Sequence, residues 1–132
     1  MEKIDFMLTP IGVVESALSS AKDAPCQGFQ GAPDAWINID KKVIEGMRDI
    51  HVGDKIIVIT WLHLSDRRVL EVHPQDNKKN QLTSVFATRS ADRPNPIGLH
   101  PVTVLQIAED KINVAPLEAI HGTPVIDIKP VI

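Results

Sequence analysis

The apolar residues of this chain fall into short runs separated by turn residues, and this spacing limits the fold more than any other feature. The longest run, Ile56 to Leu62, has seven residues including Thr60 and is rich in β-branched side chains. A buried helix usually needs about ten residues or more, so such a run is typical of a strand. Many short strands with little helix predict a β-barrel or a β-sandwich.

Apolar patterns predict strands along most of the chain. The predicted strands cover residues 8–14, 36–39, 55–63, 69–74, 82–88, 101–108, 112–117 and 125–128. Asn38 or Asp40 is expected to cap a short helix whose apolar residues lie between positions 43 and 47. Residues 19–34 are predicted to form a long loop, and residues 75–81 a polar surface loop. We therefore expect a mainly β fold, a single compact β-barrel with one or two short helices.

The composition is that of one globular domain, which we expect to cover residues 1–132. The 132 residues are 43% hydrophobic and 23% charged, which suits a soluble protein with a single core. A lone cysteine, Cys26, excludes an internal disulfide framework and suits a reducing compartment. The first residues show no export signal, and the apolar runs are far below the roughly 20 residues that span a bilayer. The expected location is cytoplasmic, with no membrane partner.

The charge balance provides no general attraction to nucleic acid. The formal net charge is −3 and the pI is near 5.9, so any contact with RNA requires a local basic patch. Such a patch would arise if Arg67, Arg68, Lys78 and Lys79 lay beside Arg93. Each basic pair is otherwise typical of a solvated face.

Residues 86–99 carry two arginines, an aspartate, an asparagine, a threonine and a serine on a backbone stiffened by two prolines. Proline fixes its own φ and pushes the residue before it toward extended geometry, so Arg93 and Asn95 are both restrained. One interpretation is a preorganised rim that recognises a ligand with negative charge and hydrogen-bonding edges. The other is a tight corner between strands whose charges face water.

Other common sites are not predicted. The seven glycines never form the G-x-G-x-x-G or phosphate-loop patterns, so a nucleotide-like cofactor would bind outside a Rossmann unit. The spacing of the five histidines does not match a metal site, so no metal ligands are assigned. Cys26 has no histidine near it in sequence and is not predicted to be a nucleophile.

The stretch VFATRSADRPNPIGL, residues 85–99, closely resembles the signature GVFATRSPxRPNPIGLS of the TsaA-like (TrmO) family. Members are S-adenosylmethionine-dependent methyltransferases, and their known reaction is N6-methylation of threonylcarbamoyl-adenosine beside the anticodon of tRNA. The resemblance therefore implies S-adenosyl-L-methionine as cofactor and tRNA as partner. It also implies a compact β-barrel that works as a homodimer and contains no Rossmann domain.

The resemblance also implies which residues contact the cofactor. Cys26 stands where the family has arginine, and His121 stands where it has aspartate. Both changes alter the charge offered to the cofactor. The implied cofactor-binding residues are Pro25, Cys26, Gln27, His63, Leu64, Arg89, His121, Gly122, Thr123 and Pro124.

The implied reaction requires the acceptor nitrogen, which is amide-like and weakly nucleophilic, to lose a proton. Asp92, His63 and His100 are the candidate proton acceptors, in that order. Asn95 offers a donor and an acceptor to an adenine edge, and Arg93 offers its guanidinium to the threonyl carboxylate or to a phosphate. The predicted catalytic residues are Asp92, Arg93 and Asn95.

Two alternatives to this function stay open. A methyltransferase of the same fold with another acceptor is consistent with Cys26, with His121 and with the acidic pI. From a different class, the barrel would bind S-adenosylmethionine or a nucleotide without catalysis.

Overall fold

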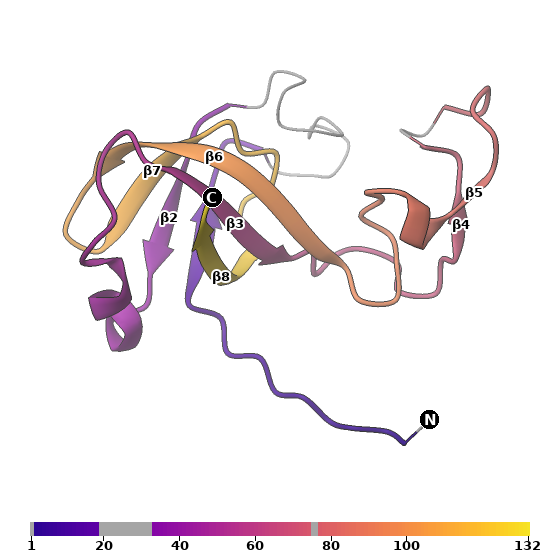
Figure 1. Ribbon diagram of the computed structural model, residues 1–132, viewed down its shortest axis with the longest axis horizontal. Coiled ribbons are helices and arrows are strands. Elements are labelled where there is room, and N and C mark those ends of the chain that lie inside the picture. The colour runs from indigo at the N-terminus through magenta and orange to yellow at the C-terminus, as the bar shows by residue number, and fades with distance from the viewer. Residues whose placement is uncertain (1, 19–32, 75–76) are drawn as a thin grey trace.

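Six antiparallel strands close into a barrel in the order β1, β2, β7, β6, β3, β8 (Figure 1). The computed structural model describes residues 2–18, 33–74 and 77–132. The barrel strands are β1 (Gly12–Glu15), β2 (Ala35–Ile39), β3 (Lys55–Trp61), β6 (Ile97–Ile107), β7 (Lys111–Ala115) and β8 (Pro124–Pro130). The mainly β, non-Rossmann barrel expected from the sequence is confirmed.

Alternation of side chains along the strands builds the core. On β3, Ile56, Val58 and Thr60 are buried, while the residues between them are half-buried at the outer face. Alternate residues from Gly98 onward are buried along β6 in the same way. Period-two alternation places one face of each strand inside the barrel. The core residues are Val14, Ala35, Ile37, Ile39, Ile56, Val58, Val102, Val104, Ile112, Val114, Leu117, Ala119 and Val125.

The short helix after β2 is confirmed as a 3-10 helix, η2 (Lys41–Met47), rather than an α-helix. Asp40 caps it, because its Oδ1 accepts a hydrogen bond of 2.9 Å from the backbone N–H of Lys42. Ile44 and Met47 pack against the core, which explains how so short a helix is held in place. Within the described residues, no helix is both long and apolar enough to cross a membrane.

The prediction of strands over residues 69–74 and 82–88 is largely wrong. Residues 69–74 and 82–88 form only the two-residue strands β4 (Glu71–Val72) and β5 (Thr83–Ser84), which pair with each other outside the barrel (Figure 1). A 3-10 helix, η4 (Val85–Ala87), follows β5, because the Thr88 N–H and hydroxyl both donate to the carbonyl of Val85 and close a turn. We call residues 62–96, between β3 and β6, the arm.

The hairpin predicted around residues 109–111 is confirmed as β6 and β7, but β6 begins earlier than expected. Ile97 to His100 extend it, because they pair with Trp61 to Val58 of β3. The motif residues 97–99 therefore belong to the barrel wall, and residues 88–96 belong to the arm.

One end of the barrel collects the segments that the sequence singled out. β3 ends there, while β6 and β8 begin there, as the pairs Trp61 with Ile97 and Thr60 with Val125 show. β1 ends beside the start of β2 at the same end, where Glu15 pairs with Trp36. We call this the site end of the barrel.

Candidate functional site

The loop of residues 88–96 is held by a guanidinium that points into the arm. Arg93 Nη2 donates to the carbonyl oxygens of Val85 and of Thr88, the second at 2.7 Å. Its Nε is buried and has no hydrogen-bond partner among the described residues. Arg93 thus binds η4 to the loop, and its predicted contact with a substrate carboxylate or phosphate stays a prediction.

The turn after β3 holds the same loop from its other side. The backbone N–H of Asp66 donates to Asp92 Oδ1 at 2.8 Å. Arg67 Nε donates to the carbonyl oxygen of Pro94 at 2.7 Å, and its Nη2 donates to Asn95 Oδ1 at 3.0 Å. Two of the predicted catalytic side chains, Asp92 and Asn95, are therefore fixed by residues 66 and 67.

Arg67 is itself supported by an aromatic ring. Its guanidinium carbon lies 5.1 Å from the centroid of the Trp61 ring, within cation–π range. The neighbouring Arg68 instead pairs with Asp66, with Nε 3.2 Å from Oδ1. The hydrogen bond from the Arg68 side chain, reinforced by that from its backbone, holds the pKa of the exposed Asp66 carboxyl below its ordinary value.

A buried hydrogen-bond chain crosses the barrel close to the site end. Thr60 Oγ1 lies 2.6 Å from His100 Nε2, and His100 Nδ1 lies 2.6 Å from Glu118 Oε1. Thr60 and His100 are only 0% and 3% exposed, so His100 is enclosed with both ring nitrogens engaged. These two contacts connect β3 and β6 to the segment that leads into His121.

The segment before β8 lies against the end of β1. The His121 N–H donates to the Leu18 carbonyl at 2.7 Å, and the Gly122 N–H donates to the Val14 carbonyl at 2.8 Å. Gly122 has φ of 88°, a left-handed conformation that suits glycine. Thr123 is buried, and its hydroxyl donates to the Ile120 carbonyl at 2.7 Å.

Three further predicted cofactor residues, His63, Leu64 and Arg89, are exposed. His63 and Leu64 lie in the turn after β3, two and three residues beyond Trp61, and Leu64 is 70% exposed. Arg89 is exposed on the arm and takes part in no ion pair with another described residue. Pro25, Cys26 and Gln27 lie outside the described residues.

The topology therefore brings His63, Leu64 and the segment of residues 121–124 to one end of the barrel, with Asn95 leading into β6 at the same end. Sequence reasoning treated Arg67 only as part of a basic pair and missed its contact with Asn95. Trp61, six positions before Arg67, was the available signal, since arginine packs favourably on aromatic faces.

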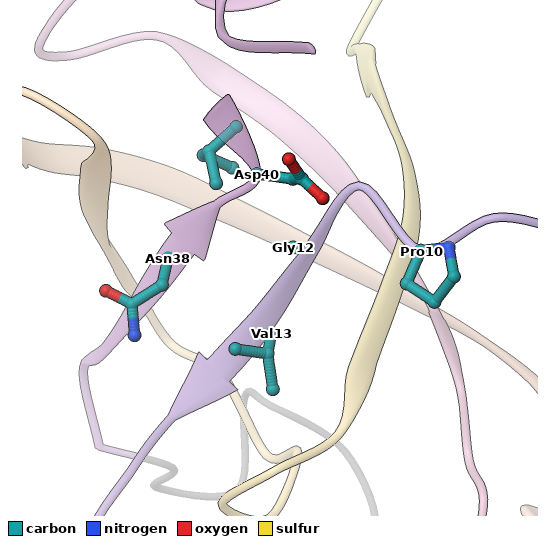
Figure 2. Close-up of a pocket in the computed structure, with 6 residues that line it drawn as sticks. Pro10, Gly12, Val13, Asn38 and Asp40 are labelled. Carbon is teal, nitrogen blue, oxygen red and sulfur yellow. The ribbon is translucent and has the colours of Figure 1, made fainter. Parts of the chain in front are cut away.

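A surface pocket lies away from the predicted site residues. A hollow of about 350 Å³ lies beside the start of β1 and the end of β2, lined by Pro10, Gly12, Val13, Asn38, Ile39 and Asp40 (Figure 2). None of these residues belongs to the predicted site. Among the described residues, no cluster of three or more histidine, cysteine, aspartate or glutamate side chains could hold a metal ion.

Comparison with known sequences agrees with the resemblance noted for residues 85–99. Residues 13–132 match the family described as the tRNA-methyltransferase O N-terminal domain. A probable S-adenosyl-L-methionine-binding protein of Methanothermobacter thermautotrophicus is 38% identical over 130 residues, covering 98% of this chain and 93% of that protein. An S-adenosyl-L-methionine-binding protein of Archaeoglobus fulgidus is 39% identical over 123 residues, covering 93% of this chain and 87% of that protein.

Comparison with solved structures supports the fold. Two crystal structures of TrmO from Pseudomonas aeruginosa match with TM-scores of 0.76 and 0.71, at 23% and 22% identity. The first match covers 99% of this chain and 56% of the TrmO chain, so this chain spans little more than half of that protein's length. At this level of identity the likeness establishes the barrel fold alone.

Proposed function

Because the chain belongs to the tRNA-methyltransferase O N-terminal domain family, we propose that it binds S-adenosylmethionine at the site end of the barrel. We further propose that it methylates N6 of a threonylcarbamoyl-adenosine beside the anticodon of tRNA. The observation that carries the proposal is the gathering of three segments at one end of the barrel. These segments are the motif loop of residues 88–96, the turn after β3 and the segment before β8.

The exposed groups at the site end and on the arm suit the cofactor's chemistry. S-adenosylmethionine carries a carboxylate, an ammonium and an adenine, and when bound it supplies an electrophilic methyl group. Arg89 would bind the carboxylate, because a guanidinium is free to offer two parallel N–H donors. His63 and the segment of residues 121–124 would contact the remaining polar groups.

The chain's own residues would mainly position the reactants, as expected for an in-line displacement. Arg93 and Arg67 hold the motif loop in one conformation through backbone carbonyls and Asn95. Oδ1 of Asp92 accepts a hydrogen bond from the Asp66 N–H, and Oδ2 accepts none from the described residues. Asp92 is therefore proposed as the group that accepts the proton from the acceptor nitrogen.

The partners are also proposals. Exposed apolar residues on the arm favour a homodimer that covers them, since a monomer rarely exposes several large apolar side chains together. They are Leu64, Leu70, Leu82 and Phe86, which are 70%, 61%, 50% and 82% exposed. Arg68, Lys78 and Lys79 are exposed on the arm and would supply the local charge for tRNA, whereas the guanidinium of Arg67 is engaged by Pro94, Asn95 and Trp61.

A thermal-shift titration with S-adenosylmethionine tests the first step, with ATP and S-adenosylhomocysteine alongside. A ligand that binds only the folded state stabilises it by about 2.7 kcal/mol at a hundredfold excess over Kd. We expect a concentration-dependent rise with S-adenosylmethionine and none with ATP. Arg89→Ala should reduce the rise in thermal midpoint, while Arg48→Ala, directly after η2, should not. No shift at millimolar concentration would contradict cofactor binding.

Methyl transfer is tested next with labelled S-adenosylmethionine and tRNA that carries or lacks the threonylcarbamoyl group. Label on the modified tRNA alone supports the proposal, and label on both kinds indicates another acceptor atom. The relatives' names mention cofactor binding and no reaction, which favours a non-catalytic binding module as the second candidate. Saturable binding with no transfer would support that candidate.

A further inference from the structure

Asn95 is held in one orientation by Arg67. A guanidinium has N–H donors and no acceptor, whereas an asparagine amide has an acceptor oxygen on one side and two N–H donors on the other. The contact of 3.0 Å between Arg67 Nη2 and the Asn95 amide therefore requires the oxygen, Oδ1, to face the arginine. The Nδ2 group must point the other way.

The surrounding contacts prevent the amide from turning over. Arg67 is fixed by its bond of 2.7 Å to the Pro94 carbonyl and by the ring of Trp61. The backbone of residue 95 is fixed as well, because its carbonyl accepts from Ile97 N–H at 2.7 Å, and Pro94 and Pro96 stiffen it on either side. Asn95 is exposed, and its Nδ2 group donates to none of the described residues.

We propose that Arg67 is a positioning residue that makes Asn95 a donor-only contact, and that Asn95 recognises a hydrogen-bond acceptor on the ligand. The proposal rests on the proposed function. The acceptor is a carbonyl, carboxylate or phosphate oxygen, or a ring nitrogen, and it belongs either to S-adenosylmethionine or to the RNA. This narrows the expectation from the sequence, in which Asn95 offered both a donor and an acceptor to an adenine edge.

Asn95→Asp separates this role from a purely structural one. The aspartate keeps an oxygen for Arg67 and strengthens that contact with charge, but it replaces the Nδ2 donors by a second acceptor. We expect a thermal midpoint equal to that of the wild type or higher. We also expect at least a tenfold loss in S-adenosylmethionine affinity or in kcat/KM for tRNA. A loss in affinity assigns the acceptor atom to the cofactor, and a loss only in kcat/KM for tRNA assigns it to the RNA.

Arg67→Ala should weaken the same parameter as Asn95→Asp, whereas Arg48→Ala, an exposed arginine at the far end of the barrel, should not. Arg67→Lys should fail to restore it, because lysine lacks the planar fork that reaches Pro94 and Asn95 together. If Asn95→Asp stays within twofold of the wild type in both binding and transfer, the inference is wrong.

A double-mutant cycle in unfolding free energy tests the contact that orients the Asn95 amide, and it needs no activity assay. Arg67→Ala and Asn95→Ala should be non-additive in urea unfolding, because each removes the same contact. Additive effects overturn the inference even if the wild type is an active methyltransferase. If the cycle shows coupling but the wild type neither binds S-adenosylmethionine nor transfers methyl, the orientation stands and the proposed function fails.

Discussion

Replacing Gly98 by alanine should destabilise the barrel by breaking its buried hydrogen-bond chain. The new Cβ would lie 2.5 Å from Thr60 Oγ1 and 2.6 Å from His100 Nε2, closer than Cβ atoms approach other heavy atoms. Gly98 pairs directly with Thr60 in the ladder between β3 and β6, so the backbone cannot easily withdraw. The methyl group therefore fits only if the contact of 2.6 Å between Thr60 and His100 is broken.

The size of the effect follows from two costs. Overpacking a filled interior costs about 1–3 kcal/mol, and leaving a buried polar group without its partner costs about 1–3 kcal/mol more. The lower entropy of the unfolded alanine variant offsets roughly 0.4–1 kcal/mol. The expected net loss is about 1–5 kcal/mol, which lowers the Tm of a domain of this size by roughly 3–20 °C.

Urea unfolding, followed by circular dichroism, measures this loss. Gly46→Ala is the matched control, because its added Cβ meets no heavy atom within 4 Å beyond its chain neighbours and the helix backbone, and we expect no loss of stability. In a Thr60→Ala background, Gly98→Ala should cost at least about 1 kcal/mol less than in the wild type. A loss below about 0.5 kcal/mol for Gly98→Ala, or an equal loss in both backgrounds, would refute the steric reasoning.

Three further predictions concern stability and charge. Asp40→Ala should destabilise the protein by about 0.5–2 kcal/mol in urea unfolding, because it removes the cap on the Lys42 N–H; an unchanged midpoint would contradict the capping role. Ile37→Val should cost about 0.5–1.5 kcal/mol in the same assay, since Ile37 is 0% exposed in the core, and no loss would mean that the site collapses freely. The hydrogen bond from Arg68 lowers the pKa of Asp66. The pairing therefore stabilises the folded state above the unfolded pKa of the aspartate, and this stabilisation is lost as pH falls through the lowered pKa of the folded state. NMR titration should therefore show a higher Asp66 pKa in Arg68→Ala, and an unchanged pKa would count against the pairing.

Local sequence patterns were sufficient to predict most strands of the barrel. Short apolar runs bounded by turn residues predicted β2, β3, β7 and β8 with ends close to those observed, because such runs are too short for a buried helix. The helix cap depends on neighbouring residues only, so the sequence limited it to Asn38 or Asp40, and the structure shows Asp40. The arm was predicted poorly, since residues 82–88 have strand-like composition but no barrel neighbour to pair with.

The short sequence motif likewise identified the family and the stiff loop, because the restraint from Pro94 and Pro96 is local. The partners of its side chains are set by closure of the barrel. Arg67 meets Asn95 across 28 positions, and Thr60 meets His100 across 40. Such contacts depend on strand register and on how the arm folds back, and no spacing along the chain encodes them. The sequence alone therefore places the chemistry on one loop, and only the tertiary structure decides which atoms of that loop remain free for a ligand.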